Sequence, residues 1–257
     1  MSHEETTPQL DLPHDPEATA RSERLIDERA VALQTRLCGA GIGSLMLEGR
    51  ATEVWLYPDR VRGYTRVDLL VGPAEHAAAI EVLRSDSYRL GARDQSEPSG
   101  HAVTLRPDED EPITLAVHRS FGGVGDVRAL WRELWSESER FPLGSGRVSV
   151  PGAIGRLLIA AFRAAAPSAP IASTDLERAL AKRPAAEWLS ARRMAGRCDA
   201  GSLFDAGLGS VEPGRSLMQS CGIGGDGVEG QSPAVTQPSR AMMPPSHGSR
   251  FRSFLGS

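Results

Sequence analysis

The chain has 257 residues, of which 40% are hydrophobic and 24% charged, and a formal net charge of −4. It is long enough to bury a substantial core, its apolar runs fall short of the roughly 20 residues that span a bilayer, and its net charge argues against nucleic acid as a partner. Cys38, Cys198 and Cys221 are far apart and form no Cys-x-x-Cys pair, which argues against a disulfide framework or thiolate metal site. The acidic N-terminus lacks the apolar segment of a signal peptide, so we expect a cytoplasmic protein without a membrane partner.

Helical and strand patterns alternate over the first 123 residues. Residues 1–19 are polar and contain three prolines, which predicts a disordered tail. From residue 20 onward, apolar residues at helical spacing alternate with short apolar runs typical of strands. This order predicts an α+β fold that begins with an α/β domain, a small mixed sheet with flanking helices over residues 20–123. The predicted helices are 20–37, 51–57 and 75–83, and the predicted strands are 44–47, 67–71, 101–105 and 113–118.

After residue 123 the pattern becomes helical. Thr174 and Glu177 have the spacing of a capping box, which predicts the start of a helix, and Pro184 is typical of the start of the next one. We therefore expect a helical domain over residues 124–218. Residues 219–257 show no period and predict a disordered tail. The predicted helices lie at 127–134, 154–161, 174–180 and from 184 onward.

The segment that leads from Arg62 through Arg66 into the predicted strand 67–71 is the most informative part of the chain. In metal-dependent nucleotidyl transfer, such a strand carries two aspartates one residue apart. Side chains at i and i+2 of a strand point to the same face, where they can hold a shared pair of Mg²⁺ ions. Here Asp68 occupies the second position and Arg66 the first. We expect the Arg66 guanidinium to pair with Asp68 and to occupy the space of the cation.

The strand at 113–118 contains the next candidate residues. Strand alternation predicts that Thr114, Ala116 and His118 face a cleft while the residues between them face the core. Neither Thr114 nor Ala116 can replace a carboxylate. His118 is either a ligand-binding residue or a structural histidine at a strand end.

Phosphate-binding candidates lie between the first two predicted strands. Gly49 follows a strand and precedes a helix, where backbone amides can approach a phosphate, and Arg50 is adjacent to it. Arg62 could bind phosphate or pair with a nearby carboxylate such as Asp59. Glu48 is either a rescue ligand for a metal or a substitution tolerated after catalysis was lost.

In order and spacing, these motifs resemble the bacterial uncharacterised nucleotidyltransferase family, a branch of the polymerase-beta-like nucleotidyltransferase superfamily. The resemblance implies a nucleotidyltransferase core, a nucleoside triphosphate ligand held near Gly49, Arg50, Arg62 and His118, and, in an active enzyme, Mg²⁺ bound to Asp68. It extends from about residue 25 to 218. The matching segments are Leu47-Glu48-Gly49, Leu56-Tyr57-Pro58, Arg62, residues 66–71, Ala116-Val117-His118, and residues 175–180, 204–208 and 213–215.

The chain departs from the family pattern at the chemical positions. Glu48 replaces a lysine, Arg66 replaces the first aspartate, and Ala116 replaces the later acidic residue. The resemblance therefore implies a pseudoenzyme that binds nucleotide with weak or lost transferase activity. Two alternatives remain open: a non-catalytic module that docks a protein partner, and an active enzyme whose altered metal shell contains Asp68, Glu48 and another carboxylate.

Overall fold

The computed structural model describes residues 16–58, 64–86, 88–90, 100–107, 113–166 and 170–223. Arg62 and Asp59 lie outside the described residues. So do residues 1–15 and 224–257, which cover most of the two predicted tails. Helices and strands both contribute to the described part, which confirms the α+β class. The boundary between an α/β domain and a helical domain at residues 123 and 124 stays a prediction.

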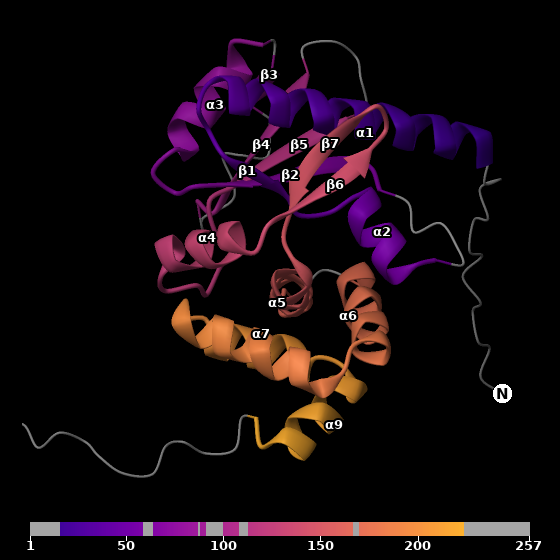
Figure 1. Cartoon of the computed structure of the whole chain (residues 1–257), viewed down its shortest axis with the longest axis vertical. Helices are drawn as coiled ribbons and strands as arrows, with labels where there is room; N and C mark the ends of the chain where they lie inside the picture. The colour runs from indigo at the N-terminus through magenta and orange to yellow at the C-terminus, as the bar shows by residue number, and fades with distance from the viewer. Residues whose placement is uncertain are drawn as a thin grey trace, which may run out of the picture. The chain divides into compact units, whose positions relative to one another are not determined.

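A mixed sheet occupies the first half of the described chain, with the strand order β1-β2-β5-β4-β3 (Figure 1). β2 runs antiparallel to β1 and parallel to β5, and the pairs β5–β4 and β4–β3 are antiparallel. In the register of β2 and β5, Asp68 lies directly opposite Ala116 and Leu70 opposite His118. The strands are β1 Ser44–Met46, β2 Arg66–Val71, β3 Tyr88–Leu90, β4 Ala102–Pro107 and β5 Thr114–His118.

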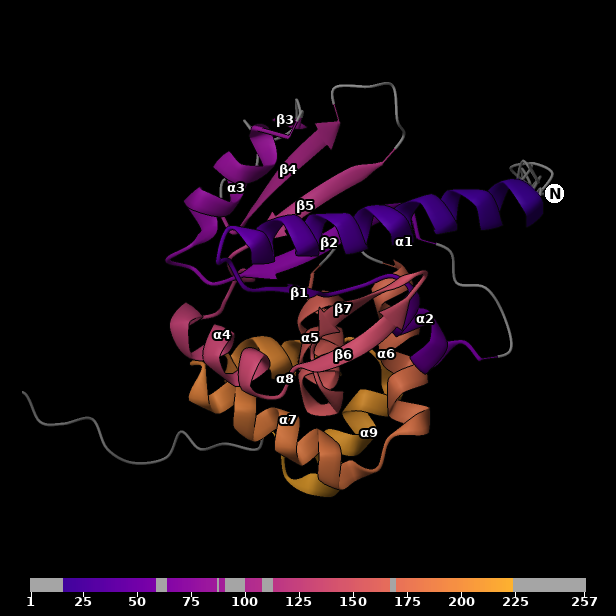
Figure 2. The same cartoon turned by 45° about the horizontal axis from the view of Figure 1, so that its top comes forward.

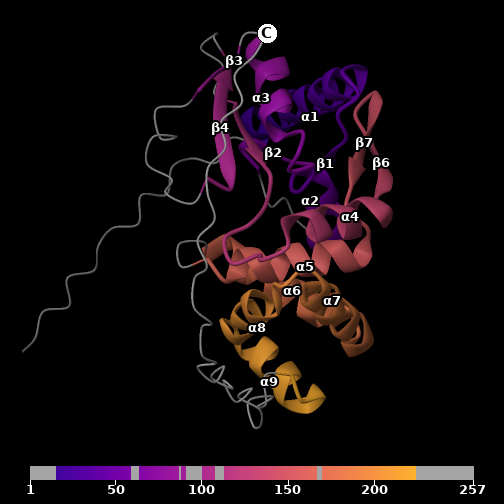
Figure 3. The same cartoon turned by 90° about the vertical axis from the view of Figure 1, so that its left-hand side faces the viewer.

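Helices α1 (Pro16–Gly39) and α3 (His76–Arg84) cover one face of the sheet (Figure 3). The predicted helical spacing places Leu33 and Leu37 of α1 in the same buried cluster as Leu69 of β2. Because side chains alternate along β2, the two neighbours of Leu69, Asp68 and Leu70, point to the opposite face. The short helix α2 (Arg50–Leu56) connects β1 to β2.

The second half packs around α5 (Ala153–Ala164), which contacts α6, α7 and α8 (Figure 1). Eight of the 12 residues of α5 are buried, so it forms the centre of this part. The close approach of α8 requires Gly207, because a Cβ atom there would clash with the carbonyl oxygen of Ala161. The other helices are α4 Val127–Ser136, α6 Pro170–Lys182, α7 Ala185–Arg197, α8 Gly201–Gly209 and α9 Glu212–Cys221.

A β-hairpin formed by β6 (Glu139–Leu143) and β7 (Gly146–Val150) interrupts the region that we expected to be helical. It packs against α1 and β1. The buried side chain of Gln34 connects the three elements, since Nε2 donates to the carbonyl oxygens of Ser44 and Ser149 at 3.1 and 3.0 Å. The backbone N–H of Ser149 donates back to Gln34 Oε1 at 2.7 Å. The hairpin therefore belongs structurally with the sheet half.

Three further features differ from the sequence prediction. The short edge strand β3 was not predicted. Helix α6 begins at Pro170, so Thr174 lies inside the helix and the capping-box prediction was wrong. Helix α9 ends at Cys221, which extends the helical part three residues into the predicted tail. None of the helices in the described ranges combines the length and apolar character that crossing a membrane requires.

Candidate functional site

The centre of the candidate site is Asp68, a fully buried carboxylate in the middle of β2. It lies on the sheet face opposite α1, with Ala116 of β5 as its direct neighbour across the ladder. Arg66, two residues earlier, lies on the same face, as the strand spacing predicts. Its Nε donates to Asp68 Oδ2 at 2.7 Å.

The second oxygen of Asp68 contacts His118. The distance from His118 Nε2 to Asp68 Oδ1 is 2.9 Å. With Asp68 ionised, this hydrogen bond requires that Nε2 be the protonated nitrogen. Both carboxylate oxygens of Asp68 are therefore engaged, one by a guanidinium and the other by an imidazole.

The helical half of the protein orients His118. The imidazole stacks on the ring of Phe121, with ring centroids 5.9 Å apart. Phe121 makes an edge contact with Phe162 of α5, at 5.6 Å between centroids. A strand residue of the sheet is thus held in place by a chain of aromatic contacts that ends in the central helix.

The surroundings of Asp68 favour its charged form. Burial alone would raise the pKa of the carboxyl group, but the hydrogen bond from His118 and the charges of His118, Arg66 and Arg163 lower the pKa well below its usual range. The carboxylate consequently remains ionised across the physiological pH range. It forms a fixed cluster with Arg66 and His118, which we call the Asp68 cluster.

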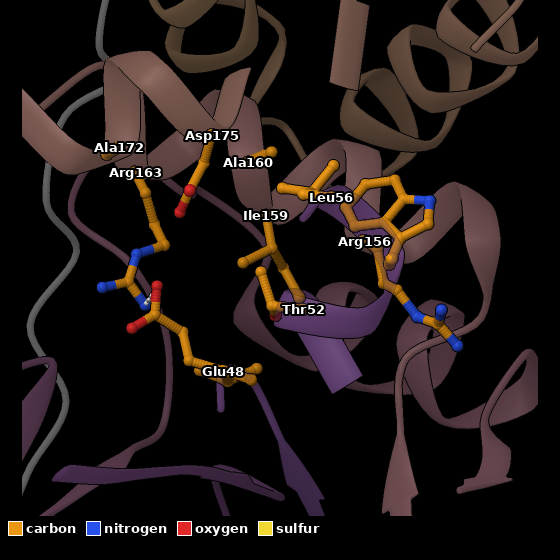
Figure 4. Close-up of a pocket in the computed structure, with 11 residues that line it drawn as sticks. Glu48, Thr52, Leu56, Arg156, Ile159, Ala160, Arg163, Ala172 and Asp175 are labelled. Atoms are coloured by element: carbon orange, nitrogen blue, oxygen red, sulfur yellow. Dashed lines mark ion pairs between the residues drawn. The ribbon is translucent and has the colours of Figure 1, made fainter. Parts of the chain in front are cut away.

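Glu48 and Arg163 form an ion pair beside this cluster, at 2.7 Å between Oε1 and Nη1 (Figure 4). Glu48 follows β1, and Arg163 is near the end of α5. The pair borders a cavity of ≈ 20 Å³ between α2, α5 and α6. That volume holds about one water molecule. Glu48 is therefore engaged by Arg163, a role that sequence reasoning did not foresee.

Gly49 and Arg50 lie at the start of α2. Gly49 has a φ of 97°, a conformation that favours glycine, and it is the N-cap of the helix. Arg50 pairs with Glu53 at 2.5 Å and lines a hollow beside α1, the helix that covers the other sheet face. The structure thus brings together Arg66, Asp68, Ala116 and His118 but directs Arg50 elsewhere, while Arg62 lies outside the described residues.

Sequence reasoning missed Arg163 and Phe121. Arg163 is one of two charged residues in the otherwise apolar helix α5, and its side chain is 22% exposed. A charged residue in a buried helix requires a partner, so its position in the pattern was the available signal. No comparable signal exists for Phe121, because its role depends on how the two halves of the chain pack.

Mg²⁺ does not fit the side chains of this site. The ion requires near-octahedral oxygen ligands at about 2.0–2.1 Å, whereas both oxygens of Asp68 have partners and Ala116 supplies no ligand. No group of three or more His, Cys, Asp and Glu side chains among the described residues is arranged to hold a metal.

The fold and the site define the chain as an α+β protein with a buried, charge-paired aspartate on the central strand pair of its sheet. Comparison with protein-family models and with curated proteins finds no match for the chain.

Proposed function

We propose that this protein is a nucleotidyltransferase-like pseudoenzyme that binds the polyphosphate part of a nucleoside triphosphate without metal and without transferring a nucleotidyl group. The observation that carries the proposal is the engagement of both Asp68 oxygens by Arg66 and His118. A fixed guanidinium thus stands where the resemblance places an aspartate ligand of a metal ion. It neutralises the remaining carboxylate by an ion pair instead of by Mg²⁺.

The strand arrangement supports a nucleotidyltransferase-like origin of the site. In the family that the chain resembles, a later strand beside the aspartate strand carries an acidic residue. Ala116 occupies that position, directly opposite Asp68 on the parallel neighbour β5. Two of the three departures from the family pattern, Arg66 and Ala116, are therefore neighbours of one carboxylate, which is what loss of a shared metal site would leave behind.

Phosphate is the part of a nucleotide that this site suits best. The side chain of Arg66 is 46% exposed, so an anion can approach the guanidinium from solvent. The cavity of ≈ 20 Å³ beside the Asp68 cluster is far smaller than the several hundred Å³ of a typical ligand pocket, so this cavity cannot enclose a base. We therefore expect weak selectivity among ATP, CTP, GTP and UTP.

The test is a calorimetric titration of the full chain with the four nucleoside triphosphates and with inorganic tripolyphosphate, in the presence of EDTA. Binding should occur without metal, with affinities that agree among the nucleotides within about tenfold. Arg66→Gln should weaken binding by about tenfold or more. Arg84→Gln is the matched control, because Arg84 is also about half exposed and paired with one carboxylate, but lies on α3.

Other outcomes separate the alternatives. Binding that requires Mg²⁺ and Asp68 would contradict the proposal and favour an active enzyme with an altered metal shell. Absence of binding by every nucleotide and by tripolyphosphate would also contradict it and favour a module that docks a protein partner. The double variant Arg66→Asp and Ala116→Glu should acquire one-to-one Mn²⁺ binding if the site descends from a metal site.

A further inference from the structure

A second charged site lies on the other side of the sheet, between α1 and the start of α2. Both views in Figures 1 and 2 show α2 beside the N-terminal half of α1. A hollow of ≈ 370 Å³ opens here, lined by Ala20, Glu23, Arg24, Asp27, Arg50 and Tyr64. This size lies within the range of small-molecule sites, about 300–1,000 Å³.

Two carboxylates and two guanidiniums line this hollow. Glu23 and Asp27 are four residues apart on α1, so they project from the same side of the helix. The buried Glu53 of α2 lies behind them and forms an ion pair with Arg50. Asp27 accepts a hydrogen bond from the Tyr64 hydroxyl at 2.6 Å. We call these five residues the Glu23 cluster.

Two guanidiniums, those of Arg24 and Arg50, line the hollow beside these carboxylates. Arg50 is the guanidinium that pairs within the cluster. Arg24, which also lines the hollow, is exposed, and its Nε donates to the carbonyl oxygen of Ala20 at 3.3 Å. Burial and the charges of Glu53 and Asp27 raise the pKa of Glu23, and burial raises the pKa of Asp27 as well. Burial is the first cause in both groups, so both carboxyl groups are poorly solvated in the folded protein.

Glu23 itself lacks a partner on one oxygen. The residue is 9% exposed, and Oε1 is buried without a hydrogen-bond partner. A buried carboxylate oxygen without a donor is unfavourable, so native proteins rarely leave one that neither water nor a ligand completes. Because Glu23 lines the hollow, the missing donor would come from a molecule bound there.

We propose that the Glu23 cluster binds an organic cation, through a primary ammonium or guanidinium group that donates hydrogen bonds to Glu23 and Asp27. An ammonium has three donors and a guanidinium five, which suits two carboxylates on one helix face. The carboxylates among the described residues do not converge in the geometry of a metal site, which favours an organic cation over a divalent metal. This site does not rest on the proposed nucleotide function, because it lies on the opposite face of the sheet.

Calorimetric titration of the full chain with putrescine and with agmatine tests the site, with 1,4-butanediol as the uncharged analogue of putrescine. One-to-one binding of a diamine or of agmatine, with no binding of the diol, is the expected result. Glu23→Gln should weaken binding by about tenfold or more. Glu81→Gln, the same substitution at an exposed position of α3, should leave the affinity unchanged.

A tripeptide with one lysine between two glycines and blocked ends distinguishes the source of the cation. Binding of the peptide but not of the free amines would assign the ammonium group to a side chain of a partner protein. Absence of binding by all of these probes would overturn the proposal, as would equal affinity in the Glu23→Gln variant or tighter binding of Mg²⁺ that displaces the amines. If Glu23→Gln does not fold, Asp27→Asn provides the same comparison.

Discussion

The protein contains two carboxylate clusters on opposite faces of one sheet, and they differ in how their carboxylates are paired. In the Asp68 cluster, one carboxylate has a guanidinium on one oxygen and an imidazole on the other. In the Glu23 cluster, Arg50 pairs with Glu53, the Tyr64 hydroxyl donates to Asp27, and Oε1 of Glu23 has no hydrogen-bond donor. Both oxygens of Asp68 thus have partners within the protein, whereas one oxygen of Glu23 has none, and we propose that a bound cation completes it.

This difference separates the stabilising cluster from the binding cluster. Removal of one partner from a fully paired buried charge is destabilising, whereas removal of a buried charge that lacks a partner relieves a cost. Removal of a charge should therefore destabilise the protein at the Asp68 cluster and stabilise it at the Glu23 cluster. Four single substitutions test this contrast.

The largest effect is expected for His118→Ala. The substitution leaves Oδ1 of the fully buried Asp68 without a donor and should lower the free energy of unfolding by about 3 kcal/mol. Urea denaturation at neutral pH measures the loss. His118→Asn should recover part of it, since the amide can also donate. The matched control is His101→Ala, at the residue that precedes β4. An equal loss of unfolding free energy in that variant would show that the contact with Asp68 is not the cause.

Asp68→Asn should lower the free energy of unfolding by about 2 kcal/mol at neutral pH, because it removes the charge that both partners contact. The pKa of Asp68 is lowered in the folded protein, so the unfolded chain binds more protons in acid. The advantage of wild type over the variant should therefore shrink from about pH 4 downward, as the pH falls through the folded-state pKa. Denaturant titrations of both proteins over an acidic pH series measure this difference in unfolding free energy. A difference that stays constant with pH would show that Asp68 is not the charged partner.

Arg66→Gln should cost less, about 1 kcal/mol, because the guanidinium is half exposed and water can replace it. The loss should decrease as salt concentration rises, since salt screens an exposed ion pair. Thermal unfolding at low and high ionic strength checks both points, with Arg84→Gln as the control for a purely exposed pair. If Arg66→Gln were as destabilising as His118→Ala, the result would contradict the half-exposed position of the guanidinium.

Local patterns predicted one cluster better than the other. Arg66 and Asp68 are two residues apart on a strand, so their shared face followed from the sequence alone. The contact between His118 and Asp68 depends on the register of β2 and β5, which no single segment specifies. Glu23 and Asp27 have the sequence pattern of a solvated helix face, and only the packing of α2 and Tyr64 beside α1 encloses them.

The missed hairpin illustrates the same limit. β6 contains Pro142, which cannot donate a hydrogen bond to a neighbouring strand, so its sequence is weak for a strand. Its position is fixed by long-range contacts instead, above all the hydrogen bonds between Gln34 and Ser149, which are 115 residues apart. By contrast, α1, β2 and α5 were predicted because each has a strong apolar period of its own.

Glu23→Gln should have the smallest effect and the opposite sign. The amide removes a buried charge and adds donors toward Asp27, so the free energy of unfolding should rise by about 1 kcal/mol or less at neutral pH. Because the pKa of Glu23 is raised in the folded protein, the folded state binds more protons than the unfolded chain above about pH 4, and wild-type stability falls as the pH rises through the folded-state pKa. The gain from the substitution should therefore disappear in acid, where both forms are neutral. Destabilisation by Glu23→Gln at neutral pH would instead show that Glu23 already has a stabilising partner, and the contrast between the two clusters would fail.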